Sequence, residues 1–195
     1  EVKDEAFKNC FVLDDLEISS SLEKIGDNAF VGCNQLVNVQ VDSSNQSFMI
    51  SEGILYTKDQ SEIVLAPNVV SSTINVLPSV KKIRSNAFHN ASKVVELHVP
   101  ATVEEIELNA FVGCTNLTKV TLPFIGTEVD SSNSFQSVFG ANLSTSLTDV
   151  TILQGTKVND KAFQNVNTVT TITLPTTIST IGENAFAGCS KWKNI

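Results

Sequence analysis

Residues 21–33 read SLEKIGDNAFVGC, and the spacing of apolar residues in this stretch returns along the whole chain. Its Ala-Phe dipeptide occurs six times, at residues 6–7, 29–30, 87–88, 110–111, 162–163 and 185–186. Three of the intervals between successive copies are 23 residues, and the two longer intervals are 58 and 52 residues. A fixed period of this length is the sequence signature of a solenoid.

Aligning the copies on Ala-Phe gives the unit V-x-x-I-x-x-x-A-F-x-x-C-x-x-L-x-x-V-x-L-P. The V-x-L run alternates apolar and polar residues, so it predicts a short strand whose apolar side chains point inward. Pro often follows this run, as at Pro100 and Pro123, and ends the strand because it cannot donate a ladder hydrogen bond. The A-F-x-x-C segment does not alternate, which indicates a tight turn or a single 3₁₀ turn on the opposite side.

A unit of 23 residues cannot bury its apolar row alone, whereas stacked copies share one continuous core. The sequence therefore predicts a repeat solenoid, a right-handed β/turn superhelix of about eight coils over residues 1–195 in a single domain. We expect a parallel sheet on one face, irregular turns on the other, and little helix. Regular repeats occupy about 1–41, 74–122 and 147–195, and irregular inserts occupy about 42–73 and 124–146.

Each insert carries a local signal. In the first, residues 53–57 and 62–66 are apolar runs on either side of the polar stretch 58–61, which predicts a β-hairpin. The second contains SFQSVFGA, which predicts a short helix ending at Gly140. There Phe139-Gly140 is expected to replace Ala-Phe in an irregular coil.

The first and last residues fall inside the repeat. Val2 already lies four residues before an Ala, and Trp192 occupies the leucine position of the last copy. An end repeat without a polar cap exposes its core and an unpaired strand edge. We therefore expect this chain to be a fragment of a longer array, or its last strand to be frayed or covered.

The cysteines all fall at one position of the repeat. Cys10, Cys33, Cys114 and Cys189 occupy it, and Ala91 and Val166 replace them in the other two copies. A position that accepts Cys, Ala or Val requires a small apolar side chain, so we interpret the four as buried free thiols. A disulfide between Cys10 and Cys33 is the alternative.

Composition and the absence of known motifs argue against several classes of function. The net charge of -8 argues against binding to nucleic acid or an anionic membrane, because both need clustered Lys and Arg. No apolar run approaches the ~18 residues of a transmembrane helix, and the first residues do not resemble a signal peptide. The sequence contains no G-x-S-x-G, phosphate-binding loop or H-E-x-x-H motif, so we expect neither an enzyme nor a cofactor.

The repeat resembles the BspA-like leucine-rich repeat family, whose unit is similar to I-P-x-x-V-x-x-I-G-x-x-A-F-x-G-C-x-x-L-x-x-I. Residues 21–33 and 178–189 follow it closely, and the G-I-L-Y-x-K-D hairpin resembles a variant unit. The resemblance implies a leucine-rich-repeat-like fold. It also implies a surface-exposed or secreted microbial protein, with adhesion to host proteins or to other cells as the typical role.

The string VDSSN occurs in both inserts, at residues 41–45 and 129–133. Its Asp and Asn oxygens could bind Ca²⁺ or a carbohydrate. We favour turn chemistry, in which Asp and Ser side chains bond nearby backbone N–H groups, because the acidic spacing matches no calcium loop.

The outward strand residues are the best candidate binding surface, since solenoids commonly bind partners on this face. They form two polar rows. Thr73 lies in one row and Asn75 lies in the other. The candidate residues are Asp15, Glu17, Asn38, Gln40, Glu96, His98, Lys119, Thr121, Asp149, Thr151, Thr171 and Thr173. The expected partner is a host or cell-surface protein, such as an extracellular matrix protein, or a glycan. The alternative is a structural spacer that displays other domains.

Overall fold

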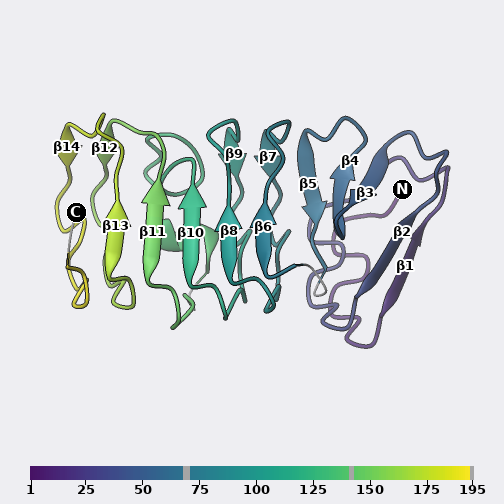
Figure 1. The fold of residues 1–195 in the computed structure, drawn as a ribbon. Helices are drawn as coiled ribbons and strands as arrows, with labels where there is room; N and C mark the ends of the chain where they lie inside the picture. The colour runs from purple at the N-terminus through teal and green to yellow at the C-terminus, as the bar shows by residue number, and fades with distance from the viewer. Residues whose placement is uncertain (68–70, 141–142, 194–195) are drawn as a thin grey trace.

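The computed structural model describes residues 1–67, 71–140 and 143–193. It is a β-solenoid of about 7 turns with parallel sheets and almost no helix. Figure 1 shows the turns stacked side by side, with the N- and C-terminal ends at opposite ends of the stack. The predicted fold class is confirmed. The number of turns is about 7, slightly below the expected eight.

The V-x-L runs form the strands of the main face, as the alternation predicted. Within the described chain these are β1 (Asp15–Ile18), β2 (Asn38–Val41), β6 (Thr73–Asn75), β8 (Glu96–His98), β10 (Lys119–Leu122), β11 (Asp149–Ile152) and β13 (Thr171–Thr173). They pair in parallel and in phase with the repeat, so that Val120 lies beside Leu97 and Val150. The strands separate into two sheets, β1-β2 and β6-β8-β10-β11-β13.

A second set of strands lies opposite the main face, where the sequence predicted only irregular turns. Its members are β3 (Phe48–Ser51), β4 (Ile54–Thr57), β5 (Glu62–Leu65), β7 (Lys82–Ile83), β9 (Glu105–Ile106), β12 (Lys157–Val158) and β14 (Thr180–Ile181). The two-residue members contain the apolar residue that precedes each Ala by four positions, such as Ile83 and Ile106. That expectation was wrong because stacking in register aligns these backbones closely enough to pair.

The first insert forms the predicted hairpin, β4-β5, and adds the unpredicted strand β3 before it. The turn between β3 and β4 is made by Glu52 and Gly53, both with positive φ. We call β3-β4-β5 the hairpin sheet. Because β5 pairs with β7, the hairpin sheet continues the second set of strands.

The second insert contains the predicted short helix, the 3₁₀ helix η1 (Phe135–Val138). Phe139 follows it and lies 5.4 Å from Phe111, ring centroid to ring centroid. Phe111 N–H donates to Val138 C=O, just as Phe88 N–H donates to Ala110 C=O in a regular coil. Val138-Phe139 therefore replaces the Ala-Phe pair, one residue earlier than the predicted Phe139-Gly140.

The buried side chains form two cores, although the sequence predicted one. The N-terminal core contains Ile18, Phe30 and Leu36, and the C-terminal core contains most of the remaining buried residues. The hairpin sheet separates the two. Its side chains alternate, so that Leu55 packs into the N-terminal core while its neighbour Ile54 packs into the C-terminal core. A pleated sheet with two apolar faces divides the core because successive side chains point in opposite directions.

The A-F-x-x-C turn contains a left-handed residue two positions after each Phe. Asn and Gly alternate there, as Asn9 and Gly32, Asn90 and Gly113, and Asn165 and Gly188. A Cβ added to Gly113 would lie 2.2 Å from Asn90 Oδ1, and the other two pairs show the same overlap. The Asn side chain of one coil thus fills the space that the Gly of the next coil leaves open. This contact explains why the regular repeats come in pairs.

The cysteine position differs in part from its prediction. Cys33 and Cys114 are buried, but Cys189 is half-buried and Cys10 is exposed, because the outermost described coils have a neighbour on one side only. All four are free. The thiols of Cys33, Cys114 and Cys189 each donate to the C=O of the Phe one coil earlier, at 3.1–3.5 Å. The position therefore favours a weak donor as well as small size.

Candidate functional site: the outward faces of the strands

The predicted polar rows exist on the five-stranded sheet. One row runs through Thr73, Glu96, Lys119, Asp149 and Thr171, which are direct neighbours on successive strands. The other runs through Asn75, His98, Thr121, Thr151 and Thr173 in the same way. Since neighbouring strands lie roughly 4.8 Å apart, the two rows form one flat surface.

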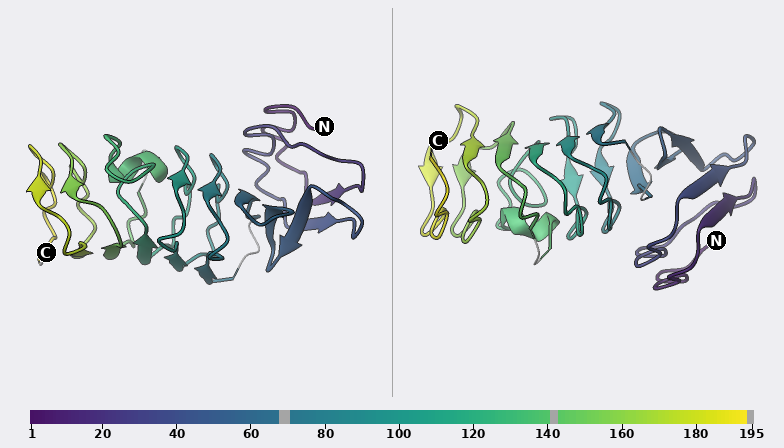
Figure 2. Two further views of the ribbon diagram at one scale, coloured as in Figure 1. Left: turned by 90° about the horizontal axis from the view of Figure 1, so that it is seen from above. Right: turned by 60° about the horizontal axis from the view of Figure 1, so that its bottom comes forward.

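The four remaining candidates lie on the separate sheet β1-β2. Asp15 is next to Asn38, and Glu17 is next to Gln40. Among the strands that the structure describes, β2 pairs with β1 alone and β6 pairs with β8 alone. Both views of Figure 2 show β1 and β2 turned away from the direction of β6–β13. The twelve candidates therefore form two surfaces, which we call the N-terminal face and the C-terminal face.

Few of the charges on the C-terminal face are neutralised by its own contacts. His98 Nε2 lies 3.5 Å from Glu96 Oε2, and His98 Nδ1 lies 3.3 Å from Thr121 Oγ1. Asp149 accepts a hydrogen bond of 2.6 Å from the Thr148 hydroxyl. Lys119 is exposed and makes no ion pair with any residue of the described chain. Its ammonium group is thus available to a partner.

Around β7 and β9 of the second set, the charged side chains form ion pairs, although Lys157 of β12 has none within the described chain. Lys82 bridges Glu107 at 2.5 Å and Glu105 at 3.3 Å, and Lys81 contacts Glu104 at 2.8 Å. Burial raises the pKa of Glu107, but hydrogen bonds from Lys82 and from Ser85 N–H outweigh burial, so the pKa lies below its ordinary value. Closed ion pairs offer less to a partner than the unpaired Lys119 does.

The N-terminal face is acidic and hollowed. Asp15 Oδ1 accepts a hydrogen bond of 2.7 Å from Asn38 Nδ2. Glu17, Gln40 and Asp42 line an open hollow of about 400 Å³ at the ends of β1 and β2. Residues 1–67 hold 12 Asp and Glu against 4 Lys, whereas residues 71–193 hold 9 acidic and 9 basic residues. The whole net charge of -8 therefore belongs to the N-terminal third.

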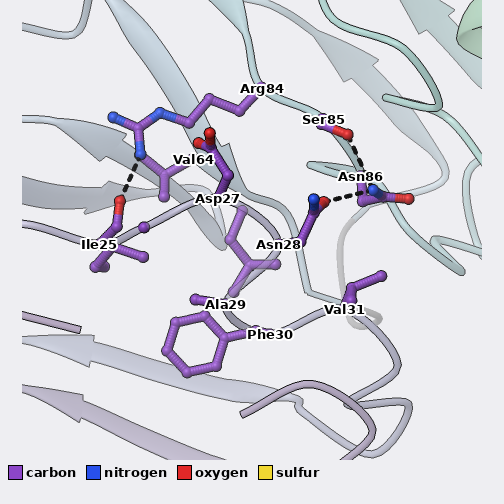
Figure 3. A pocket seen from close by; sticks show the side chains of 12 residues that line it. Ile25, Asp27, Asn28, Ala29, Phe30, Val31, Val64, Arg84, Ser85 and Asn86 are labelled. Carbon is purple, nitrogen blue, oxygen red and sulfur yellow. Dashed lines mark hydrogen bonds between the residues drawn. The ribbon is translucent and has the colours of Figure 1, made fainter. Parts of the chain in front are cut away.

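A cluster of polar contacts, which we call the seam, joins the N-terminal coils to the C-terminal coils between residues 25–28 and 84–86 (Figure 3). Arg84 Nη1 donates to Ile25 C=O at 3.0 Å, and Arg84 Nε donates to Glu62 at 2.7 Å. Asn86 Nδ2 donates to Asn28 Oδ1 at 2.6 Å. These contacts surround a cavity of about 30 Å³. The repeat pattern does not predict these contacts, and their one sequence signal is that Arg84 is the only arginine of the chain.

The two VDSSN loops use their carboxylates differently: Asp42 bonds within its own turn, as favoured, whereas Asp130 bonds to the next coil and not to nearby backbone N–H groups. Asp42 Oδ1 accepts hydrogen bonds from Ser44 N–H and Ser44 Oγ, at 2.8 and 2.6 Å. Asp130 accepts from Thr156 N–H, from the Thr156 hydroxyl and from Lys157 N–H, all in the next coil. These bonds lower the pKa of both carboxyl groups, the Ser44 and Thr156 hydroxyls having the largest effect. The Asp42 carboxylate is thus bonded within its own loop, and the Asp130 carboxylate joins its loop to the next coil.

Other reactive groups are not arranged for chemistry. Burial raises the pKa of the Cys114 thiol to about 12, so that it is not a thiolate at neutral pH. Burial also lowers the pKa of His89. Within the described ranges, no group of three or more His, Cys, Asp or Glu residues could hold a metal ion. A search of the same ranges finds no helix long and apolar enough to cross a bilayer.

Comparison with known proteins identifies the repeat. The sequence model of the BspA-type leucine-rich repeat region matches residues 1–137 and 67–193, with six copies. The chain belongs to the BspA-type leucine-rich repeat family. Leucine-rich repeat proteins are generally non-enzymatic and usually serve as protein-binding or surface modules. No curated protein matches the chain significantly.

Solved structures of bacterial repeat proteins share the fold. The pneumococcal vaccine antigen PcpA is 21% identical, with a TM-score of 0.58 over 93% of this chain and 38% of its own. A leucine-rich cell surface protein from Faecalibacterium prausnitzii A2-165 is 21% identical, with a TM-score of 0.59 over 99% and 62%. A leucine-rich repeat protein from Bacteroides ovatus is 20% identical, with a TM-score of 0.60 over 98% and 50%. This BspA-type chain spans less than two thirds of each.

Proposed function

We propose that this BspA-type chain is a non-enzymatic protein-binding or adhesion module of a cell-surface or secreted protein. The C-terminal face is the surface that engages the partner. Two proteins that share the fold, a vaccine antigen and a cell surface protein, support the location. The family supports binding over catalysis.

One observation carries the choice of face. The C-terminal face is a flat array of five strands in which Lys119 is exposed and unpaired within the described chain. On the opposite side Lys81 and Lys82 are held in ion pairs. A partner that contacts the C-terminal face can therefore use charge without first breaking an internal pair, which would cost binding energy.

Binding to immobilised host proteins tests the proposal. A panel of extracellular matrix proteins and glycans is presented to the wild type, to Lys119→Glu and to His98→Ala. Loss of a rim charge changes binding rate and salt dependence, and a central anchor has a larger effect. We expect capture by at least one matrix protein, and a loss of about tenfold or more for Lys119→Glu at an unchanged melting temperature.

Lys93→Glu is the matched control. Lys93 is exposed and lies in the loop before β8, outside the two polar rows, so this variant makes the same charge change away from the face. It should bind like the wild type, apart from long-range effects that salt removes. Equal loss in both lysine variants would show a nonspecific charge effect. Unimpaired binding by both face variants would leave the spacer role as the better explanation.

A further inference from the structure

The break in the main sheet creates an internal edge at β6. Strands β8, β10 and β11 of the five-stranded sheet each pair with a neighbour on both sides, but among the described strands β6 pairs with β8 alone. The chain reaches β6 from the hairpin sheet, and β2, which would precede it in an uninterrupted array, belongs to the other sheet. β6 is therefore an edge strand in the middle of the solenoid.

Hydrogen bonds show which groups of β6 face the gap. Glu96 N–H donates to Ser72 C=O, and Val76 N–H donates to His98 C=O. In a parallel ladder alternate residues bond to the same neighbour, so the even-numbered residues 72–76 face β8. The backbone groups of Thr73 and Asn75 consequently point away from β8.

Most of these outward groups lack a partner. Thr73 N–H is bonded to the Ser71 hydroxyl at 3.3 Å. No hydrogen bond within the described chain involves the other outward groups, which are Thr73 C=O, Asn75 N–H and Asn75 C=O. Ser71, Ser72, Thr73 and Asn75 are all exposed residues. Successive outward residues of a strand repeat roughly every 6.6 Å, and another extended backbone matches that spacing.

The edge also lacks the usual protection against strand addition. Natural edges are blunted by charges, Pro or bulges. β6 reads Thr-Ile-Asn and has none of these, whereas the outer edge strand β1 carries Asp15 and Glu17. The opposite edge strand β13 is also uncharged, but Thr170 C=O at its start accepts from Lys193 N–H. Shortness, three residues, is the only blunting feature of β6.

We propose that the free edge of β6 is a second binding site, at which an extended segment of a partner polypeptide adds a strand to the five-stranded sheet. The ligand is recognised by its backbone: it donates to Thr73 C=O and Asn75 C=O and accepts from Asn75 N–H. Continuity with the ladder β6–β13 makes a polypeptide strand the occupant, because main-chain hydrogen bonds supply the affinity in this mode. The site adjoins the C-terminal face, whose two rows begin at Thr73 and Asn75, but it uses the backbone groups at the strand edge and not the outward side chains.

Amide hydrogen exchange on the intact chain tests the edge directly. In the free protein the Ile74 and Val76 amides should be protected and the Asn75 amide should exchange rapidly. The probe is a synthetic peptide of residues 115–123, TNLTKVTLP, which contains the repeat strand β10. At saturation it should slow exchange at Asn75 by about tenfold or more and leave the Thr151 amide unchanged.

Two variants separate backbone pairing from other effects. Asn75→Pro removes the outward N–H, and Pro is tolerated on strand edges. It should abolish peptide binding, whereas Asn75→Thr keeps the N–H and should bind normally. Lys119→Glu should also bind the peptide normally, so failure of the proposed function does not affect this test. Protection of Asn75 in the free monomer, binding that survives Asn75→Pro, or dimerisation through β6 would each overturn the proposal.

Discussion

The N-terminal third and the C-terminal two thirds are built from the same repeat but differ in how well they bury it. Phe30 and Phe111 occupy the same position, yet Phe30 is 7% exposed and Phe111 is 1% exposed. Phe30 stacks on the half-exposed Phe7, whereas Phe111 lies between Phe88 and Phe139. A coil in a solenoid gains stability from its neighbours, so two regular coils against a hairpin sheet are weaker than a longer stack.

The comparison also concerns charge. The N-terminal third carries the whole excess of negative charge, and the remainder of the described chain is balanced. Self-repulsion destabilises a compact state. Low burial and high charge together make the N-terminal coils the part expected to open first, and the predictions below test this difference.

The largest expected effect is in the C-terminal core. Phe111→Ala should destabilise the protein by ~3–5 kcal/mol, because the Phe stack prevents the cavity from collapsing. Phe30→Ala should cost less, since its site is partly open to solvent. Amide exchange at increasing urea concentration measures the two parts separately, at Val39 for the N-terminal core and at Val120 for the C-terminal core. Equal losses for the two variants would contradict the difference in burial.

A pair of substitutions in the hairpin sheet tests the division of the core. Leu55 and Ile63 are both fully buried, but Leu55 belongs to the N-terminal core and Ile63 to the C-terminal core. Leu55→Ala should cost ~2–5 kcal/mol and speed amide exchange mainly at Val39. Ile63→Ala should instead speed amide exchange mainly in the C-terminal core, for example at Ile83. If Leu55→Ala accelerated Val120 to the same extent as Val39, the two cores would be one cooperative unit.

At each Asn–Gly contact between coils, the two residues should be exchangeable only when both are changed together. Gly113→Asn keeps a residue that tolerates positive φ, but its Cβ would overlap Asn90 Oδ1. We expect a loss of roughly 1–3 kcal/mol, as for other strained positions. The double variant Gly113→Asn with Asn90→Gly should recover most of it, as thermal unfolding can show. A double variant no more stable than the single one would disprove the stacking explanation.

The smallest effect is a difference in pH response between the two VDSSN loops. The pKa of Asp130 is lowered, so its bonds to Thr156 and Lys157 stabilise the folded state above the ordinary carboxyl pKa. That stability is lost as pH falls through the lowered value, below 3.8. Acid should therefore shift the Thr156 amide resonance and loosen a junction between coils, and Asp130→Asn should remove the response. Asp42 bonds within its own loop, so acid should not loosen β1-β2 through it.

Much of the fold follows from the residues alone. The alternation in Val120-Thr121-Leu122 predicts a strand with the threonine outward, and β10 has that arrangement. The second insert likewise contains its helix and its substitute phenylalanine. Position in the repeat predicted which candidate side chains face outward, because strand geometry fixes the direction of every second residue.

The candidate surface was less predictable. Alignment of the repeats places Glu17 and Thr121 in one row, but the two residues lie on different sheets. Ile54-Leu55-Tyr56 has no polar residue and is buried throughout. The local sequence pattern can predict a strand that is buried on both faces. It cannot predict that the two faces pack into different cores, because the cores are formed by contacts with distant coils.

The sequence by itself determined the period, the inward and outward positions, the Phe stack and the sites of the two irregular inserts. These depend on local geometry that every copy repeats. Only the tertiary structure decided that the hairpin sheet divides the core, that Arg84 joins the two parts, and that β6 is left with a free edge. Those features arise where the repeat is interrupted, and there the partners of a residue are set by the packing of segments that the period does not relate.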